Sequence, residues 1–222
     1  MENTMQKNKI ASFLGVVQIV IILASIVLSI YFYQNFPEVV PIHWNVSGEA
    51  DNFSSKAFGA FLFPVILIAM YFLFELLPKI DPRKDRYAEF VKAYSVIKTA
   101  IISVFFGIYV VAGLNTLGHN VPVDFWVPLI IGLLFMVLGN YFGKIRNNYF
   151  VGIRTPWTLS NEEVWNKTHR LGGKLFMLGG VVMVLMGFAP VALRLPLLAV
   201  VVFSISVLPI AYSYFLYKRL QK

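Results

Sequence analysis

The run IASFLGVVQIVIILASIVLSIYFY, residues 10–33, decides the fold class, because it stays apolar over a length that crosses a bilayer. A helix needs about 20 residues of this kind to span the hydrocarbon core. The run is longer than the ~7–15-residue apolar region of a signal peptide, and no small-x-small cleavage site closes it. We therefore expect a retained first transmembrane helix.

Five more apolar runs of similar length follow, and each predicts a further span. These spans are residues 57–77, 93–114, 124–143, 175–193 and 196–217. The composition agrees, because the chain is 58% hydrophobic and only 14% charged, whereas a soluble domain averages about 25% charged residues. The sequence therefore predicts an all-α polytopic membrane protein with six transmembrane helices.

The charges predict the orientation. Of the nineteen Lys and Arg residues, sixteen fall on the side of the termini, and only Lys56 and Arg194 fall on the other side. Lys98 lies near the start of the third span, on the side of the termini, where its side chain can snorkel toward water. Because positive charge marks cytoplasmic loops, we expect both termini in the cytoplasm. This orientation accounts for the net charge of +8, so no direct nucleic-acid partner is expected. The chain has no cysteine, which excludes disulfide and thiolate chemistry.

The outer loop between the first two spans has its own turn chemistry. Pro37 and Pro41 favour extended backbone. The segment Asn45-Val-Ser-Gly48 predicts a turn in which Gly48 takes a positive φ.

Three ligand-type side chains, His43, Glu49 and Asp51, are expected to cluster near this turn. One interpretation is a metal or proton-sensing site, although the spacing matches no strong metal signature. The favoured interpretation is a folded cap with Trp44 at the headgroup level. No metal or other cofactor is expected.

The inner loop between the fourth and fifth spans is long, polar and aromatic. Gly152 and Pro156 bend its backbone. Ser160 and Glu163 form a candidate capping box, which predicts a short amphipathic helix over residues 161–171. That helix is expected to lie on the membrane and to end at a corner formed by Gly172 and Gly173.

Single polar residues indicate less about function than the two loops do. Arg154 is expected either to hold an anion or to have a structural role, and Thr155 and Thr158 have no base nearby that would make them nucleophiles. His119 and His169 are predicted to be solvated loop histidines. Inside the spans Gln18 and Glu75 are the polar candidates, with Glu75 reaching Lys79. An apolar bundle centre argues against an ion-coupled pump.

Both loops carry a family resemblance. The segment Asn148-x-x-x-Gly-Ile-Arg-Thr-Pro-Trp-Thr-Leu-Ser-Asn-Glu-Glu-Val-Trp-Asn-Lys-Thr-His-Arg170 closely resembles the signature of the SdpI immunity-protein family. The segment Pro41-Ile-His-Trp-Asn-x-x-Gly-x-x-Asp51 resembles a domain of unknown function that often precedes it. The chain would then consist of an N-terminal module, residues 1–92, and an SdpI-like module, residues 93–222.

The resemblance implies a non-enzymatic protein of the bacterial cytoplasmic membrane that protects against a secreted killing peptide. It also implies recruitment of a cytoplasmic transcriptional repressor, and contact with membrane lipids. We expect the outer residues His43, Trp44, Asn45, Glu49 and Asp51 to meet the peptide toxin. We expect the inner residues Arg154, Thr155, Pro156, Trp157 and Trp165 to brace the bundle or bind the cytoplasmic partner. The alternatives are a small transporter or lipid-handling protein, and a metal-dependent membrane enzyme at the outer loop.

Overall fold

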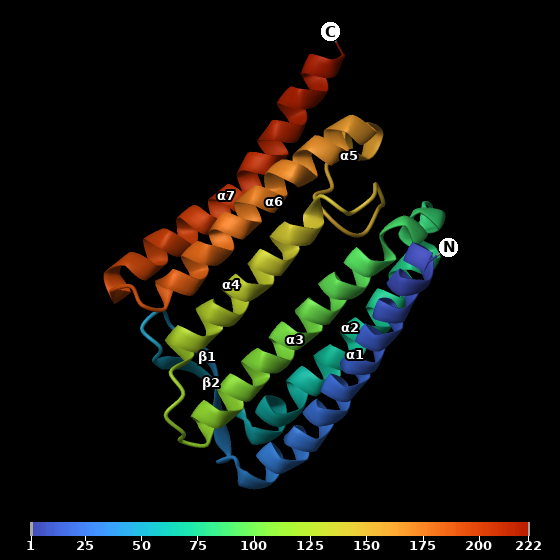
Figure 1. Cartoon of the computed structure of the whole chain (residues 1–222). Coiled ribbons are helices and arrows are strands. Elements are labelled where there is room, and N and C mark those ends of the chain that lie inside the picture. The colour runs from blue at the N-terminus through green and yellow to red at the C-terminus, as the bar shows by residue number, and fades with distance from the viewer. Residues whose placement is uncertain (1, 222) are drawn as a thin grey trace.

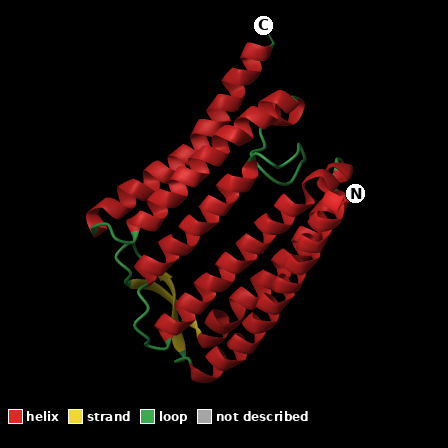
Figure 2. Ribbon diagram, viewed as in Figure 1, coloured by secondary structure: helices red, strands yellow, loops and turns green. Residues whose placement is uncertain are grey.

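The computed structural model describes residues 2–221 and is dominated by six long helices (Figure 2). Each of the six is long and apolar enough to cross a membrane, which confirms the all-α polytopic prediction. They are α1 (Glu2–Asn35), α2 (Lys56–Ile80), α3 (Val91–Thr116), α4 (Val123–Phe142), α6 (Glu162–Met186) and α7 (Val191–Leu220). A 3-10 helix, η1 (Lys84–Phe90), leads into α3, and a short helix, α5 (Pro156–Ser160), precedes α6.

The long helices form two groups of three (Figure 1). Helices α1, α2 and α3 pack together, α4, α6 and α7 pack together, and the groups meet through α3 and α4. Both termini lie at one end of the bundle, here called the terminal end, and a β-hairpin lies at the other, here called the hairpin end. Placement of the terminal end in the cytoplasm stays a prediction of the charge count.

The hairpin is the feature that the all-helical expectation omitted. Strands β1 (Val39–Trp44) and β2 (Ala50–Ser55) pair antiparallel, with Val39 opposite Ser55. Val40 is buried beneath the hairpin and packs with Phe32 and Tyr109 in one core cluster. The outer loop is therefore a folded cap, as predicted, and its extended backbone is organised as two strands.

Glycines allow α4 and α6 to lie in close contact. A Cβ atom on Gly173 would sit 2.7 Å from the carbonyl oxygen of Gly139, and one on Gly180 would sit 2.6 Å from that of Gly132. Small residues at this spacing let two membrane helices approach backbone to backbone. This contact holds the second group of helices together.

The same packing explains why the predicted corner at Gly172 and Gly173 is wrong. Helix α6 runs without interruption through both residues, so neither a surface helix over 161–171 nor a span over 175–193 exists. A Cβ atom on Gly172 would sit 2.4 Å from the side chain of Ile153. The pair serves close packing along a continuous helix.

The predicted turn over residues 193–196 is also wrong. The chain reverses after α6 ends at Met186, where Phe188 N donates to Leu185 O over 3.0 Å. Pro190 is the N-cap of α7, and its restricted φ suits the start of a helix. Pro196 lies inside α7, and so does Pro209. Pro128 lies inside α4 and Pro64 lies inside α2.

Polar side chains inside the first group of helices pair with one another. The Nε2 atom of Gln18 donates to Thr99 Oγ1 over 2.6 Å, and both side chains are buried. Glu75 pairs with Lys98 on α3 instead of the predicted Lys79. Because Lys98 finds a carboxylate within the protein, it has no need to snorkel to water.

The α4–α6 contact predicts a contrast between two Gly→Ala substitutions. Both changes raise helix propensity, but Gly173→Ala adds a methyl group 2.7 Å from a backbone oxygen, whereas Gly15 has nothing within 4 Å. We expect Gly173→Ala to lower the apparent melting temperature in detergent, since overpacking costs about 1–3 kcal/mol, and Gly15→Ala to leave it unchanged or raised. Equal shifts in the two variants would contradict the close contact.

Candidate functional site

The turn of the hairpin has the predicted geometry. Gly48 adopts a φ of 82°, and its amide donates to Asn45 O over 2.9 Å. The Oδ1 atom of Asn45 accepts from the amides of Ser47 at 2.9 Å and Glu49 at 3.1 Å. Asn45 therefore shapes the turn from inside, which limits its freedom to contact a ligand.

His43 and Asp51 face each other across the two strands. The His43 Nδ1 and Asp51 Oδ1 atoms lie 2.5 Å apart, with the side chains 65% and 44% exposed. The carboxylate of Glu49 instead accepts from Asn45 Nδ2 over 3.1 Å. Within residues 2–221, no group of three His, Cys, Asp or Glu side chains is placed to hold a metal ion. The geometry at the turn is that of an exposed hydrogen-bonded pair.

Trp44 joins the hairpin to the connection between α3 and α4. Its Nε1 atom donates to Asn115 Oδ1 over 3.2 Å, and Asn115 Nδ2 donates to Val121 O over 3.1 Å. The indole thus has a polar attachment within the protein in addition to the headgroup-level position that the sequence suggests.

An ion pair anchors the tip of the hairpin to the second group of helices. Arg194 Nη1 lies 2.6 Å from Asp124 Oδ2, and the two side chains are only 12% and 21% exposed. The same Nη1 donates to Val46 O in the turn over 3.1 Å, and a Cβ atom on Gly48 would lie 2.8 Å from Asp124 Oδ1. Sequence reasoning missed this pair, although two isolated charges at the sparsely charged ends of neighbouring spans were a usable signal.

Two pockets flank the hairpin and share a wall. The first, of about 310 Å³, lies between the hairpin, α2, α3 and α4. The second, of about 470 Å³, lies between the hairpin, α4, α6 and α7. Both are lined by His43, Trp44, Val123 and Val127. Their volumes lie in the ~300–1,000 Å³ range of ligand pockets, so the hairpin end can receive two apolar groups, one on each side of Trp44.

Most residues that line the two pockets are apolar. The first pocket includes Phe58, Leu62, Phe63, Ile108 and Ala112, and the second includes Pro128, Ile131, Met183, Met186 and Leu198. The polar groups nearest to them are the His43–Asp51 pair and the Asp124–Arg194 pair. An apolar interior with a few polar groups at the edge is the usual make-up of a binding site.

The inner loop at the terminal end is tightly bonded to itself. Thr155 caps α5, where its Oγ1 accepts from Thr158 N over 3.1 Å while its own amide donates to Thr158 Oγ1 over 2.9 Å. Pro156 takes the first helical position, where proline costs no hydrogen bond. Thr155 Oγ1 also lies 3.0 Å from Ser213 Oγ on α7. Thr155 therefore caps α5 and contacts α7, and Pro156 begins α5.

The predicted capping box at Ser160 and Glu163 is wrong. Ser160 is the last residue of α5, and the N-cap of α6 is Asn161, whose Oδ1 accepts from Val164 N over 3.0 Å. The extended backbone of Asn161 separates the two helices, so the start of α6 is displaced by one residue from the expected position.

Trp165 lies at the centre of the terminal-end core. It is fully buried, and its Nε1 donates to Ile145 O over 2.9 Å. Its ring stacks on His169 with centroids 4.0 Å apart. His169 was expected to be solvated but is 1% exposed, and its Nε2 accepts from Ile153 N over 2.9 Å. The histidine is one turn after Trp165 on a buried helix face, so it serves as a core residue.

The other two predicted residues lie nearer the surface. Trp157 packs on Tyr214 of α7, with ring centroids 5.0 Å apart. Arg154 is exposed and donates from Nη1 to Tyr149 O over 2.9 Å. Of the five predicted inner residues, Arg154 alone presents a charged group to solvent.

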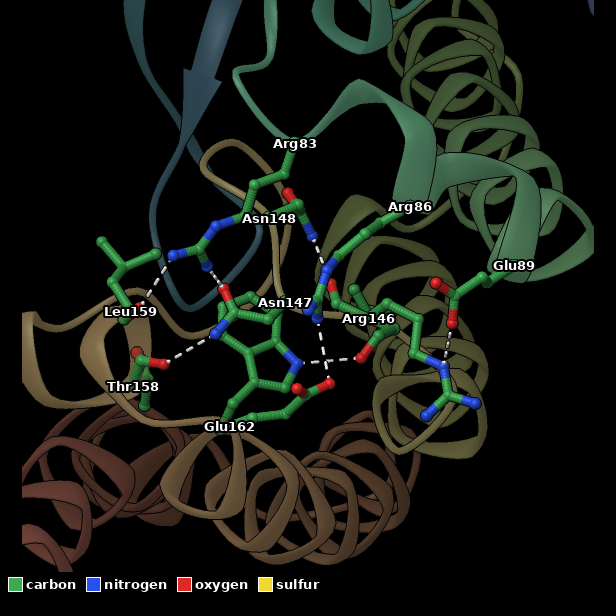
Figure 3. A network of polar contacts seen from close by, with 11 residues as sticks. Arg83, Arg86, Glu89, Arg146, Asn147, Asn148, Thr158, Leu159 and Glu162 are labelled. Carbon is green, nitrogen blue, oxygen red and sulfur yellow. Dashed lines mark hydrogen bonds and ion pairs between the residues drawn. The ribbon is translucent and has the colours of Figure 1, made fainter.

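A polar network that sequence reasoning missed connects the two groups of helices (Figure 3). Arg83, between α2 and η1, donates to Asn147 Oδ1, and over 3.1 Å to Leu159 O. Asn147 is 3% exposed and donates to Thr158 O over 3.1 Å. The sequence does not reveal this network, because Arg83 is 64 residues from Asn147 and 76 residues from Leu159.

Asp81 extends the same network. Its side chain is buried. There its Oδ2 accepts from Tyr87 OH and from the amide of Tyr149, each over 3.0 Å. Asn148 accepts from the amides of Phe150 and Val151 over 2.9 and 2.7 Å. The inner loop is therefore held to the α2–α3 connection by buried hydrogen bonds.

Comparison with known proteins matches two separate segments of the chain. The model of the SdpI/YfhL protein family matches residues 144–213. A domain of unknown function (DUF1648) matches residues 20–68. Immunity protein SdpI of Bacillus subtilis (strain 168) is 27% identical over 206 residues, which cover 93% of this chain and 97% of that protein. The chain is thus similar to this immunity protein over nearly its whole length, and its second half matches the SdpI/YfhL family model.

Similarity and fold together give the location. The six apolar helices and the similarity to immunity protein SdpI support a multi-pass protein of the cytoplasmic membrane. The matched residues 144–213 contain the inner loop with α5, α6 and most of α7. The comparison with solved structures found no match.

The Asp124–Arg194 pair predicts that one substitution loosens the hairpin tip. Arg194→Ala removes the donor to Val46 O and leaves a half-buried carboxylate, so we expect hydrogen exchange at the amides of Asn45 and Gly48 to become at least about tenfold faster. Lys56→Ala breaks a more exposed ion pair with Glu38 and is the control, for which little change is expected. Unchanged exchange in Arg194→Ala would contradict the anchor.

The terminal-end network predicts a stability difference between two polar substitutions. Asn147→Leu removes the partner of Thr158 O and of Arg83 Nη1, which should cost about 1–3 kcal/mol and lower the apparent melting temperature. Arg86→Ala removes an ion pair with Glu162 whose members are 37% and 55% exposed, so its effect should stay below about 1 kcal/mol. If both variants have the same apparent melting temperature as the parent protein, the network does not stabilise the fold.

Proposed function

We propose that the chain is a membrane immunity protein that gives resistance to a secreted antimicrobial peptide, which it binds at the hairpin end. Sequence similarity supports the general role, since the relative that aligns with 93% of the chain is named an immunity protein. The role is one of binding, in which no residue needs to perform a covalent step.

The distribution of charge supports an outward-facing hairpin. Only Lys56 and Arg194 carry positive charge at this end, and each is paired with a carboxylate, Glu38 and Asp124 respectively. The terminal end carries the other basic loops, and by the positive-inside rule this supports a hairpin that faces outside the cell. A secreted peptide arriving from outside would then meet the hairpin first.

The pair of pockets on either side of Trp44 is the observation that carries the proposal. Burial of a large apolar side chain is worth about 1.5–3 kcal/mol, so two such groups supply enough free energy for specific recognition. The exposed His43–Asp51 pair at the common wall can exchange its internal hydrogen bond for one to the peptide backbone. The ligand class that fits is a peptide with apolar side chains spaced to enter both pockets.

The inner loop has a different part in this proposal. Thr155, Pro156, Trp157 and Trp165 are engaged in contacts that brace α5, α6 and α7. Arg154 is an exposed cation of the loop, and a cytoplasmic partner such as a repressor would be recognised through it. Peptide resistance itself then does not depend on Arg154.

Toxin challenge of cells that express single variants tests the proposal. Trp44→Ala and His43→Ala open the common wall of the pockets. We expect each variant to lower the highest toxin concentration that the cells survive by roughly tenfold, the equivalent of about 1.4 kcal/mol of binding free energy. Arg154→Ala should protect like the parent protein. Membrane levels of every variant must be equal by immunoblot.

Phe53→Ala is the matched control. It removes an exposed aromatic side chain from the same hairpin, and Phe53 lines neither pocket. Full protection by Phe53→Ala with loss in Trp44→Ala places recognition at the pockets. Loss in Arg154→Ala, with full protection by both wall variants, would place it at the inner loop and refute the proposal.

A further inference from the structure

A third pocket lies at the terminal end and differs in chemistry from the two beside the hairpin. It has a volume of about 390 Å³ and lies between η1, the first turn of α3 and the end of α4. Its walls include Glu89, Phe90, Lys92, Tyr141, Lys144 and Arg146. None of these residues belongs to the hairpin end.

The pocket carries an excess of positive charge. Arg146 and Glu89 form an ion pair with Nε and Oε2 3.2 Å apart (Figure 3), so they offset each other. Lys92 and Lys144 are exposed, and neither forms an ion pair with any residue whose side chain the structure describes. Two uncompensated ammonium groups therefore border the same cavity.

One of these lysines is held in place. The Nζ atom of Lys144 lies 4.3 Å from the centroid of the Tyr141 ring, a cation–π contact that restrains the side chain. The arginine at the same rim offers further donors, since a guanidinium has five N–H groups. Convergent lysine and arginine donors of this kind recognise phosphate oxygens.

The position of the pocket selects the source of the phosphate. Phe90 and Ala93 form its buried floor, and the apolar part of α3 begins at Ala93. The cavity therefore opens where the hydrocarbon core gives way to headgroups. Basic pockets between helices at the cytoplasmic surface are typical sites for anionic lipid headgroups.

We propose that this pocket binds the phosphate of an anionic phospholipid, such as phosphatidylglycerol, from the cytoplasmic leaflet. Lys92 belongs to α3 and Lys144 follows α4, so one headgroup would bridge the two groups of helices at the place where they meet. Bound lipid would then stabilise the assembled bundle, as any ligand selective for the folded state does. The site is independent of peptide binding at the hairpin.

Native mass spectrometry of the purified full-length protein in detergent tests this site. We expect the parent protein to retain phosphatidylglycerol and to retain phosphatidylcholine much less. Lys92→Gln/Lys144→Gln should weaken phosphatidylglycerol binding roughly tenfold or more. Each basic residue near the membrane surface changes the affinity by a factor of about five, and the double variant removes two. Lys92→Arg/Lys144→Arg keeps both charges and should retain the lipid.

Lys174→Gln/Lys218→Gln is the matched control. It removes two positive charges from the same end of the molecule, and Lys218 lies over the Tyr214 ring at 4.8 Å, as Lys144 lies over Tyr141. Equal lipid loss in the two Gln pairs, or equal retention of the two lipids by the parent protein, overturns the proposal. Binding of soluble glycerol phosphate as tight as that of the lipid overturns the membrane as the source.

Discussion

The hydrocarbon core of a membrane admits only backbone whose hydrogen bonds are satisfied locally, and the rest of this structure depends on that constraint. Six helices cross the apolar layer. The hairpin, the α3–α4 connection and the inner loop lie beyond it at the two ends (Figures 1 and 2). Side chains that can recognise a polar ligand are therefore concentrated at those ends, which divides the molecule into a hairpin end and a terminal end with separate chemistry.

Polar contacts at each end join two helical groups that otherwise meet through α3 and α4. At the hairpin end Arg194 of α7 donates to Val46 O in the turn of the hairpin. At the terminal end Arg83 bonds Asn147 and the inner loop. The two hairpin pockets lie on opposite sides of this junction, one against α2 and α3 and the other against α6 and α7. A peptide that fills both would contact both groups at once.

The sequence was sufficient for the features that depend on local pattern. Apolar length predicted six spans, and Asn45 and Gly48 predicted the outer turn, because turn geometry follows from a few adjacent residues. Errors arose where tertiary contacts decide. Gly172 and Gly173 look like a corner in sequence, yet Ile153 of the inner loop and Gly139 of α4 require their small size. His169 looked solvated because the sequence does not show that α6 buries that face. Contacts such as Asp124–Arg194 join residues 70 positions apart, beyond any local pattern.

The central claim is that the hairpin end faces outward and holds the peptide. The absence of native cysteine permits a direct measurement with single-cysteine variants and a membrane-impermeant maleimide. Val46→Cys, beside the second pocket, should be labelled in intact cells and protected by the peptide, whereas Ser160→Cys, in the inner loop, should be labelled only after permeabilisation. Labelling of Ser160→Cys in intact cells, or labelling of Val46→Cys that the peptide leaves unchanged, would contradict the account.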